Sequence, residues 1–248
     1  MRYCVEFSYF GKHYFGYQIQ RHQVSVQEVI ERAFSTLLRE EIKITGAGRT
    51  DTGVHAKKIY AHLDTEQIIV QGFCRKVNSF LPPDIAVHRI FPVTDAFHAR
   101  FDATYRTYEY HISLDKNPFL TDFAWQHWKK DLDMDKMNQA AEILFEYQDF
   151  ACFSKVGADN KTTICQIFFA QWEQKNGRLI FTISANRFLR NMVRAIVGTL
   201  VEVGRGKIEL SDFRKIIDSK DRGKAGSSAP AQGLYLVDVG YEWEKFKC

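Results

Sequence analysis

The sequence has no paired cysteines and no long apolar run, and each absence excludes a class of protein. Its five cysteines, an odd number, stand far apart, and none belongs to a CxxC pair. This pattern argues against a disulfide framework and a structural zinc site, and it favours reduced thiols in a reducing compartment. No apolar stretch reaches the ~20 residues that span a bilayer, and the N-terminus MRYCVEFSYF contains no signal-peptide core. We therefore expect a cytoplasmic protein without a membrane segment.

Low-complexity segments and Pro/Ser-rich linkers are missing as well. The 248 residues are 45% hydrophobic and 26% charged, which matches an average globular protein and excludes a disordered or collagen-like chain. The formal net charge of +4 permits an anionic partner but does not require one. Aromatic residues make up 14% of the chain. This is more than a core needs, and it leaves rings for stacking or for an interface.

Each half of the chain is predicted to contain strand, helix, strand, strand, helix and strand, with one extra short helix in the second half. Ser25 and Glu28 form a capping box before the first helix, and Asn176-Gly177 indicates a type I′ hairpin. The expected strands are 3–9, 42–46, 59–63, 85–91, 105–114, 163–173, 178–185 and 233–239, and the expected helices are 26–38, 68–81, 135–147 and 188–203, with a shorter one capped by Ser211.

This order of elements predicts an α+β fold. We expect two similar α/β subdomains, residues 1–103 and 104–248, each with an antiparallel or mixed sheet and with helices on one face. No flexible linker separates them, so we expect them to pack tightly. The two sheets are expected to join into one continuous sheet with a central cleft.

The most informative segment is the loop GAGRTDTGVH at residues 46–55. On an extended loop Arg49 and Asp51 point the same way, and pairing would keep the carboxylate ionised and oriented, as a nucleophile or base requires. An ordinary turn is the plain alternative, because Asp and Thr beside Gly often cap a loop through their own backbone. The triplet Asp51-Thr52-Gly53 also matches aspartic proteases, which need two such carboxylates. The chain has one such triplet, so only a homodimer could supply that dyad.

Several segments together resemble one known family. GAGRTDTGVHA resembles the signature loop of the tRNA pseudouridine synthase I (TruA-type) family. Other segments resemble further motifs of that family, in the same order and over nearly the whole chain. They are Tyr9-x-Gly11, Phe15-Gly16-Tyr17-Gln18, Ser25-Val26-Gln27-Glu28, Phe97-His98-Ala99-Arg100-Phe101, Arg106-x-Tyr108-x-Tyr110, Asn191-Met192-Val193-Arg194-x-Ile196-Val197-Gly198 and Ala231-x-Gly233-Leu234-Tyr235-Leu236. Tyr17, Thr52 and Thr107 depart from the family pattern, where Trp, Ala and a basic residue are more frequent.

The resemblance implies an isomerase that converts uridines 38–40 in the anticodon stem-loop of tRNA to pseudouridine, without a cofactor or a metal. It makes Asp51 the catalytic carboxylate and Arg49 the group that holds it. It implies that Tyr108 stacks on the flipped uracil, that Leu234 forms an apolar wall against the base, and that the protein is a homodimer. The alternative is a module that binds structured RNA without chemistry.

Basic residues are the candidates for phosphate contacts. Arg187, Arg190 and Arg194 are spaced three and four apart, so they would share one face of the helix expected at 188–203. Gly198 continues that face and would permit close approach of a backbone. Lys57 is a further candidate, and the alternative for all four is a solvated basic surface. His55 and His98 stand alone and are expected to be hydrogen-bonded structural residues rather than metal ligands.

Overall fold

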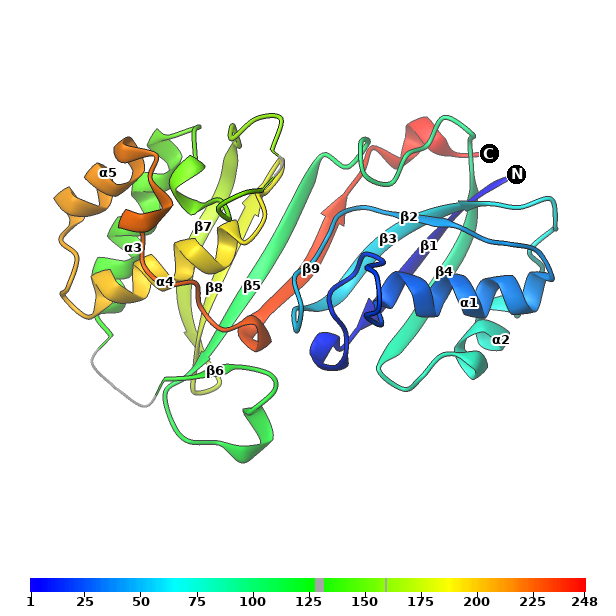
Figure 1. The fold of residues 1–248 in the computed structure, drawn as a ribbon, viewed down its shortest axis with the longest axis horizontal. Coiled ribbons are helices and arrows are strands. Elements are labelled where there is room, and N and C mark those ends of the chain that lie inside the picture. The colour runs from blue at the N-terminus through cyan, green and yellow to red at the C-terminus, as the bar shows by residue number, and fades with distance from the viewer. Residues whose placement is uncertain (128–131, 159) are drawn as a thin grey trace. The chain divides into compact units, whose positions relative to one another are not determined.

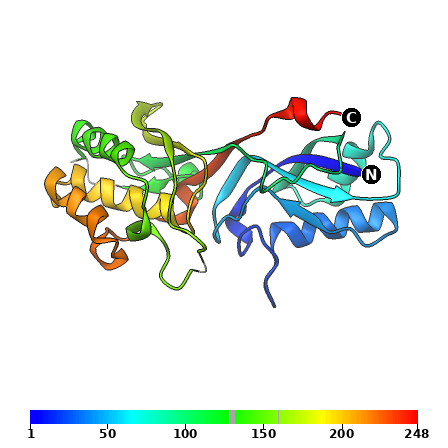
Figure 2. The same ribbon diagram turned by 90° about the horizontal axis from the view of Figure 1, so that it is seen from above.

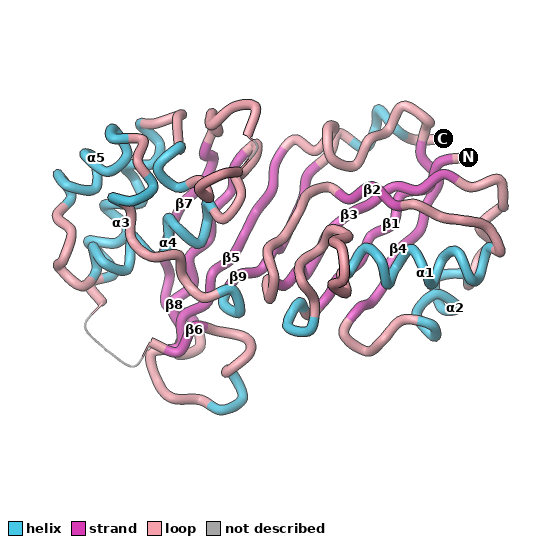
Figure 3. Tube along the Cα trace, in the orientation of Figure 1, coloured by secondary structure: helices cyan, strands magenta, loops and turns pink. Residues whose placement is uncertain are grey.

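Both halves of the chain contain strands as well as helices (Figure 3). The computed structural model describes residues 1–127, 132–158 and 160–248. The chain forms two compact units, which we name unit 1 (Met1–Thr104 with Tyr235–Cys248) and unit 2 (Tyr105–Leu234). Each unit contains β-strands that pair in a sheet and α-helices that pack beside them, so the α+β prediction is confirmed.

The sheet of unit 1 has the order β4-β1-β3-β9. β1 runs antiparallel to both β3 and β4, and β9 runs parallel to β3. β2 pairs with the far end of β3, so β2 and β9 share one edge of β3. The strands are β1 (Arg2–Tyr9), β2 (Ile44–Gly46), β3 (His55–Asp64), β4 (Ile85–Val93) and β9 (Leu234–Gly240).

Two helices belong to unit 1, α1 (Val26–Leu38) and α2 (Phe73–Phe80), and they contact each other. α1 buries Val26, Ile30 and Phe34, which recur every four residues on one face. The hydroxyl of Ser25 accepts a hydrogen bond from the Glu28 amide at 3.2 Å, which confirms the Ser25 half of the predicted capping box. α2 begins five residues later than predicted because Gly72, with φ +87°, stands directly before it in a left-handed conformation.

The sheet of unit 2 has the antiparallel order β5-β8-β7, with the short β6 parallel to β5. Asn176 and Gly177 both have positive φ, +52° and +72°, as the predicted type I′ turn between β7 and β8 requires. Helices α3, α4 and α5 pack against one another beside these strands (Figures 1 and 2). The elements are β5 (Tyr105–Ser113), β6 (Trp125–Gln126), α3 (Met134–Ile143), β7 (Ile167–Lys175), β8 (Arg178–Ala185), α4 (Met192–Gly204) and α5 (Leu210–Ser219).

Two expected helix starts in unit 2 differ from the structure. α4 begins at Met192 instead of residue 188, because Asn191 adopts a left-handed conformation with φ +65° that a helix cannot continue through. α5 is preceded by Glu209 at the N-cap position, so Ser211 lies inside the first turn.

All five cysteines are free thiols, and three of them are buried. Within the described ranges of the chain, every helix is too short or too polar to cross a membrane.

Candidate active site

Asp51 lies in the loop that joins β2 to β3. The Val54 amide donates to the Asp51 carbonyl oxygen at 3.1 Å, and Gly53 has φ +78°. This is a tight turn with a positive φ at its third position, where glycine is favoured. The turn interpretation is therefore correct for the backbone. The Asp51 side chain is half-buried and that of Arg49 is exposed, so both groups remain partly accessible to a ligand.

Residues of the N-terminal segment hold this loop on both sides of Asp51. On one side, the Tyr17 amide donates to the Thr50 carbonyl oxygen at 3.3 Å, and the Tyr9 hydroxyl lies 2.9 Å from the Thr50 hydroxyl. On the other side, the Gly53 amide donates to the Tyr14 carbonyl oxygen at 3.4 Å. The carboxylate is thus carried by a backbone that is anchored one residue before it and two residues after it.

Two glycines allow the N-terminal segment to approach the loop so closely. A Cβ atom on Gly11 would lie 1.9 Å from the Val54 carbonyl oxygen, and one on Gly16 would lie 2.5 Å from that of Thr50. Gly16 also has φ +91°, which other residues rarely adopt. These contacts explain physically why glycines stand at these two positions of the N-terminal motifs.

His55 fastens the end of the loop. Its buried ring stacks on Phe10 with centroids 4.7 Å apart and lies 4.8 Å from the ring of Tyr235. Its Nδ1 atom accepts a hydrogen bond from the Gly11 amide at 2.9 Å, so the prediction of a hydrogen-bonded structural residue is confirmed. Lys57 projects from β3 with its Nζ atom 5.2 Å from the Tyr235 ring centroid, within cation–π range.

His98 is also a structural residue, as predicted. Its Nδ1 atom accepts hydrogen bonds from the amides of Arg100 and Phe101, at 3.2 and 3.3 Å. Its own amide donates to the Asp102 carboxylate at 2.6 Å. This histidine therefore organises the tight turn that follows β4.

In unit 2, Tyr108 and Tyr110 lie two residues apart on β5 and differ in their surroundings. Tyr108 is half-buried, and its ring meets that of Phe188 edge-on at 5.2 Å. Tyr110 is fully buried, and its hydroxyl donates to the Pro230 carbonyl oxygen at 2.7 Å. Tyr110 is thus a structural tyrosine, whereas Tyr108 is only half-buried. Leu234, the first residue of β9, is buried, as expected of an apolar wall and equally of an ordinary strand residue.

The helical face expected to carry three arginines does not exist. Arg187 and Arg190 precede α4, so the helical spacing argument does not apply to them. Arg194 is half-buried in the first turn of α4, and its Nε atom donates to the Ala229 carbonyl oxygen at 2.7 Å. Every other residue of α4 except Glu202 is buried, so this helix is part of the core of unit 2.

The close backbone approach expected at Gly198 is present, but the backbone belongs to the chain itself. It is the segment 225–230, whose position sequence reasoning did not anticipate. Arg222 donates to the Gly226 carbonyl oxygen at 3.0 Å and to the Ser228 hydroxyl at 2.9 Å, and Asn191 also donates to that hydroxyl. No periodicity signals these contacts, because the segment is irregular and two of its partners, Asn191 and Gly198, lie far from it in sequence.

A family model described as tRNA pseudouridine synthase matches residues 7–102 and 140–242. This chain belongs to the tRNA pseudouridine synthase family. The tRNA pseudouridine synthase A of Bacteroides fragilis is 49% identical over 249 residues, which cover 99% of this chain and 98% of that protein. The corresponding enzyme of Porphyromonas gingivalis is 45% identical over 250 residues and covers 99% of both chains. That of Shewanella amazonensis is 38% identical over 97% of this chain and 93% of its own length.

Membership of the tRNA pseudouridine synthase family confirms the resemblance inferred from the motifs. The matched ranges contain the loop with Arg49 and Asp51 as well as Arg194 and Leu234, whereas Tyr108 lies between the two ranges. An aspartic protease is thereby excluded as the family of this chain.

Proposed function

We propose that this chain is a tRNA pseudouridine synthase, an isomerase that converts uridine to pseudouridine at positions 38–40 of the anticodon stem-loop, with Asp51 as its catalytic carboxylate. Family membership over nearly the full chain supports the reaction. One observation supports Asp51 as the catalytic residue. Asp51 is the only carboxylate in the loop 46–55, and backbone hydrogen bonds fix that loop at Thr50 and at Gly53.

The reaction breaks the N1–C1′ glycosidic bond of uridine and forms a C5–C1′ bond. N1 gains a proton and C5 loses one, so atoms and electrons balance without an oxidant or an energy source. The proposal therefore includes no cofactor and no metal. Asp51 acts at the sugar or the base while the glycosidic bond is broken, and Arg49 holds it by a charge-assisted hydrogen bond.

Tyr108 stacks on the everted uracil, and its hydroxyl assists removal of the C5 proton. Its half-buried ring, in contrast to that of Tyr110, supports this assignment. Leu234 forms an apolar wall against the base. The expectation of one continuous sheet with a central cleft stays a prediction.

Eversion of a base costs a few kcal/mol, so phosphate contacts must hold the stem-loop. We propose Arg187, Arg190, Arg194 and Lys57 for these contacts. Arg190 and Lys57 are exposed, which supports their inclusion. We further propose that the protein acts as a cytoplasmic homodimer, and the five free thiols are in keeping with a reducing compartment.

The substitution Asp51→Asn tests the assignment, because it removes the charge and keeps the shape. We expect loss of pseudouridine formation in a tRNA transcript, with tRNA affinity within about threefold of that of the unmodified chain. Asp135→Asn, the same change at an exposed position in α3, serves as the control and is expected to be active. If the Asp51 variant still converts uridine, Asp51 is not the catalyst. If the unmodified chain binds tRNA but forms no pseudouridine, the chain is a binding module.

A further inference from the structure

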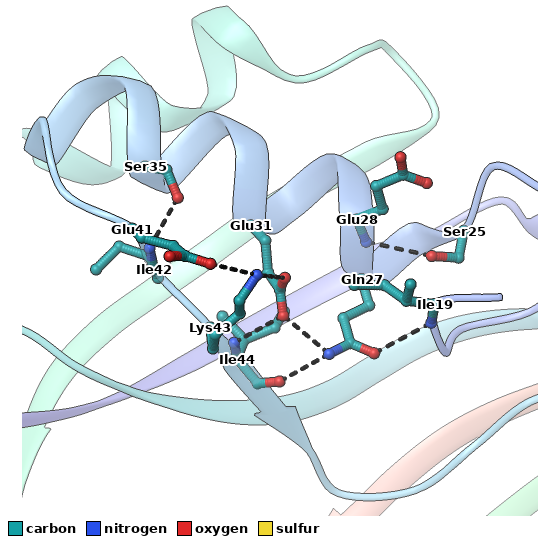
Figure 4. Close-up of polar contacts among 10 residues, drawn as sticks. All are labelled: Ile19, Ser25, Gln27, Glu28, Glu31, Ser35, Glu41, Ile42, Lys43 and Ile44. Atoms are coloured by element: carbon teal, nitrogen blue, oxygen red, sulfur yellow. Dashed lines mark hydrogen bonds and ion pairs between the residues drawn. The ribbon is translucent and has the colours of Figure 1, made fainter. Parts of the chain in front are cut away.

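A buried carboxylate lies where α1 meets β2. The Glu31 side chain is 7% exposed. Its Oε1 atom accepts hydrogen bonds from the Ile44 amide at 3.0 Å and from Nε2 of Gln27 at 2.9 Å (Figure 4). Burying a charge is costly unless it is hydrogen-bonded or paired. The Lys43 ammonium, 3.7 Å from Oε2, adds a partner from the solvent side.

The Gln27 side chain joins three segments at this point. Its Nε2 atom donates to the Ile44 carbonyl oxygen at 3.0 Å as well as to Glu31, and its Oε1 atom accepts from the Ile19 amide at 3.2 Å. The view in Figure 4 shows the side chain lying between α1 and the two chain segments that it binds. An amide is required here, since one group must donate on one side and accept on the other.

Both segments that Gln27 binds lead directly to the Asp51 loop. Ile44 opens β2, which ends at Gly46, where the loop begins. The backbone N–H of Gln27 also donates to the Tyr17 carbonyl oxygen at 2.9 Å, and the Tyr17 amide in turn donates to the Thr50 carbonyl oxygen. The Gln27 side chain binds the same N-terminal segment at Ile19, so backbone and side chain together tie α1 to the segment that holds the residue preceding Asp51.

We propose that Gln27, held by the buried Glu31, is a positioning residue that fixes the Asp51 loop for the reaction. The inference rests on the proposed function, because it assumes that Asp51 is the catalyst. In this proposal Gln27 touches no reacting atom. It acts by holding the entry to the loop and the N-terminal segment at one fixed separation.

The nearly isosteric substitution Gln27→Glu gives this proposal a distinctive signature. It places a second carboxylate against Glu31, and two such groups cannot both ionise without strong repulsion. At lower pH a proton shared between the two carboxyl groups restores the hydrogen-bond donor that the side-chain amide of Gln27 supplies in the unmodified chain. The other charged or titratable groups at this point are Tyr17, Lys43 and Glu41. Burial raises the pKa of Tyr17 well above its ordinary value, and the hydrogen bond between Lys43 and Glu41 raises the pKa of Lys43 and lowers that of Glu41, so their pKa values move away from the range of the experiment.

The experiment measures kcat and KM for tRNA between pH 6 and pH 8.5 in the Gln27→Glu variant. We expect kcat at pH 8.5 to fall at least tenfold, to recover severalfold by pH 6, and KM to change less than threefold. The matched control is Gln67→Glu, the same change at an exposed position of unit 1. It should show the pH profile of the unmodified chain.

The double variant Gln27→Glu/Glu31→Gln exchanges the acid and the amide. One hydrogen bond between the two side chains is restored without a second charge, so kcat at pH 8.5 should recover at least threefold and the extra pH dependence should vanish. Unchanged kcat in Gln27→Glu at every pH would overturn the inference. So would a loss of kcat that follows the loss of folded protein, measured by circular dichroism, with no pH dependence.

The Asp51→Asn variant separates the two levels of the argument. If it is inactive while Gln27→Glu has normal kcat, the positioning role is wrong and the catalytic assignment stands. If Asp51→Asn remains active, the catalytic assignment itself is wrong, whatever Gln27→Glu does.

Discussion

Gly198 of α4 lies directly against the carbonyl oxygen of Ser227, so closely that a Cβ atom on Gly198 would stand 1.8 Å from it. The obstacle is backbone, which cannot rotate away as a side chain can. We therefore expect Gly198→Ala to lower the free energy of unfolding by about 2 kcal/mol or more, measured by urea denaturation. Gly48→Ala is the control, since no atom lies within 4 Å of a Cβ there, and a loss of equal size in that variant would refute the explanation.

Tyr108 and Tyr110 should respond in opposite ways to the same substitution. Tyr110→Phe removes a buried hydrogen bond to the Pro230 carbonyl oxygen, and we expect it to cost about 1 kcal/mol of stability. Tyr108→Phe keeps the stacking ring and removes the hydroxyl proposed to act on the C5 proton. We expect a fall in kcat of about tenfold or more with an unchanged urea midpoint. Equal kcat in the two variants would contradict the role given to Tyr108.

Local signals in the sequence predicted local structure correctly. The Ser25 cap and the Asn176-Gly177 turn depend only on neighbouring residues, and both are present as expected. The helix starts at α2, α4 and α5 were wrong for local reasons, and the strand bounds were wrong where a distant segment decides the pairing. β3 extends back to His55, beyond the predicted 59–63, because its first residues pair with β9 from the far end of the chain. Sequence periodicity carries no information about such pairings.

The candidate site shows the same division. The loop with Asp51 was identifiable from its own residues, but its anchoring by Tyr17 was not, because that contact joins residues far apart in sequence. The arginine face failed for a different reason. A basic residue every three or four positions predicts a shared face only if the segment is helical. Here the helix α4 begins only at Met192, after the left-handed Asn191, so Arg190 lies outside the helix.

The hydroxyl of Tyr17 is buried without a hydrogen-bond partner among the residues that the structure describes. Burial removes this hydroxyl from water, and no hydrogen bond within the protein compensates for that loss. Tyr17→Phe should therefore leave the free energy of unfolding unchanged or raise it by up to about 1 kcal/mol. Tyr9→Phe is the matched control and should cost about 1 kcal/mol, because the Tyr9 hydroxyl is bonded to Thr50. Thermal denaturation of the two variants checks both values.

His62 should make the protein less stable in mild acid. Burial, with the positive charges of Arg2 and His98 acting in the same direction, lowers the pKa of His62 to about 4. The Nδ1 atom of His62 accepts a hydrogen bond from the Ala99 amide. In the unfolded chain its pKa is about 6.5, so the unfolded state binds a proton first as the pH falls. The free energy of unfolding should therefore decline between about pH 6.5 and pH 4, by roughly 1.4 kcal/mol for each unit between the two pKa values.

The comparison with His62→Gln isolates this contribution, since glutamine cannot titrate and its amide oxygen can accept the Ala99 hydrogen bond. Urea denaturation at pH 7 and pH 5 should show a smaller loss in the variant than in the unmodified chain. If the free energy of unfolding falls by the same amount in both proteins, His62 is not responsible for the loss of stability in acid.

Salt dependence tests the proposed phosphate contacts. Each contact releases counterions, so the logarithm of tRNA affinity should fall steeply and linearly with the logarithm of salt concentration, with a slope of about 0.7 to 0.9 per contact. Replacing Lys57 or Arg190 by Ala should lower that slope by about one. Lys215→Ala, at an exposed lysine of α5 that pairs with Asp212, should leave the slope unchanged. A flat response in the unmodified chain would contradict phosphate-dominated binding, and an unchanged slope in a variant would remove that residue from the contact surface. Arg194→Ala is expected to reduce stability as well, because its Nε atom holds the Ala229 carbonyl oxygen.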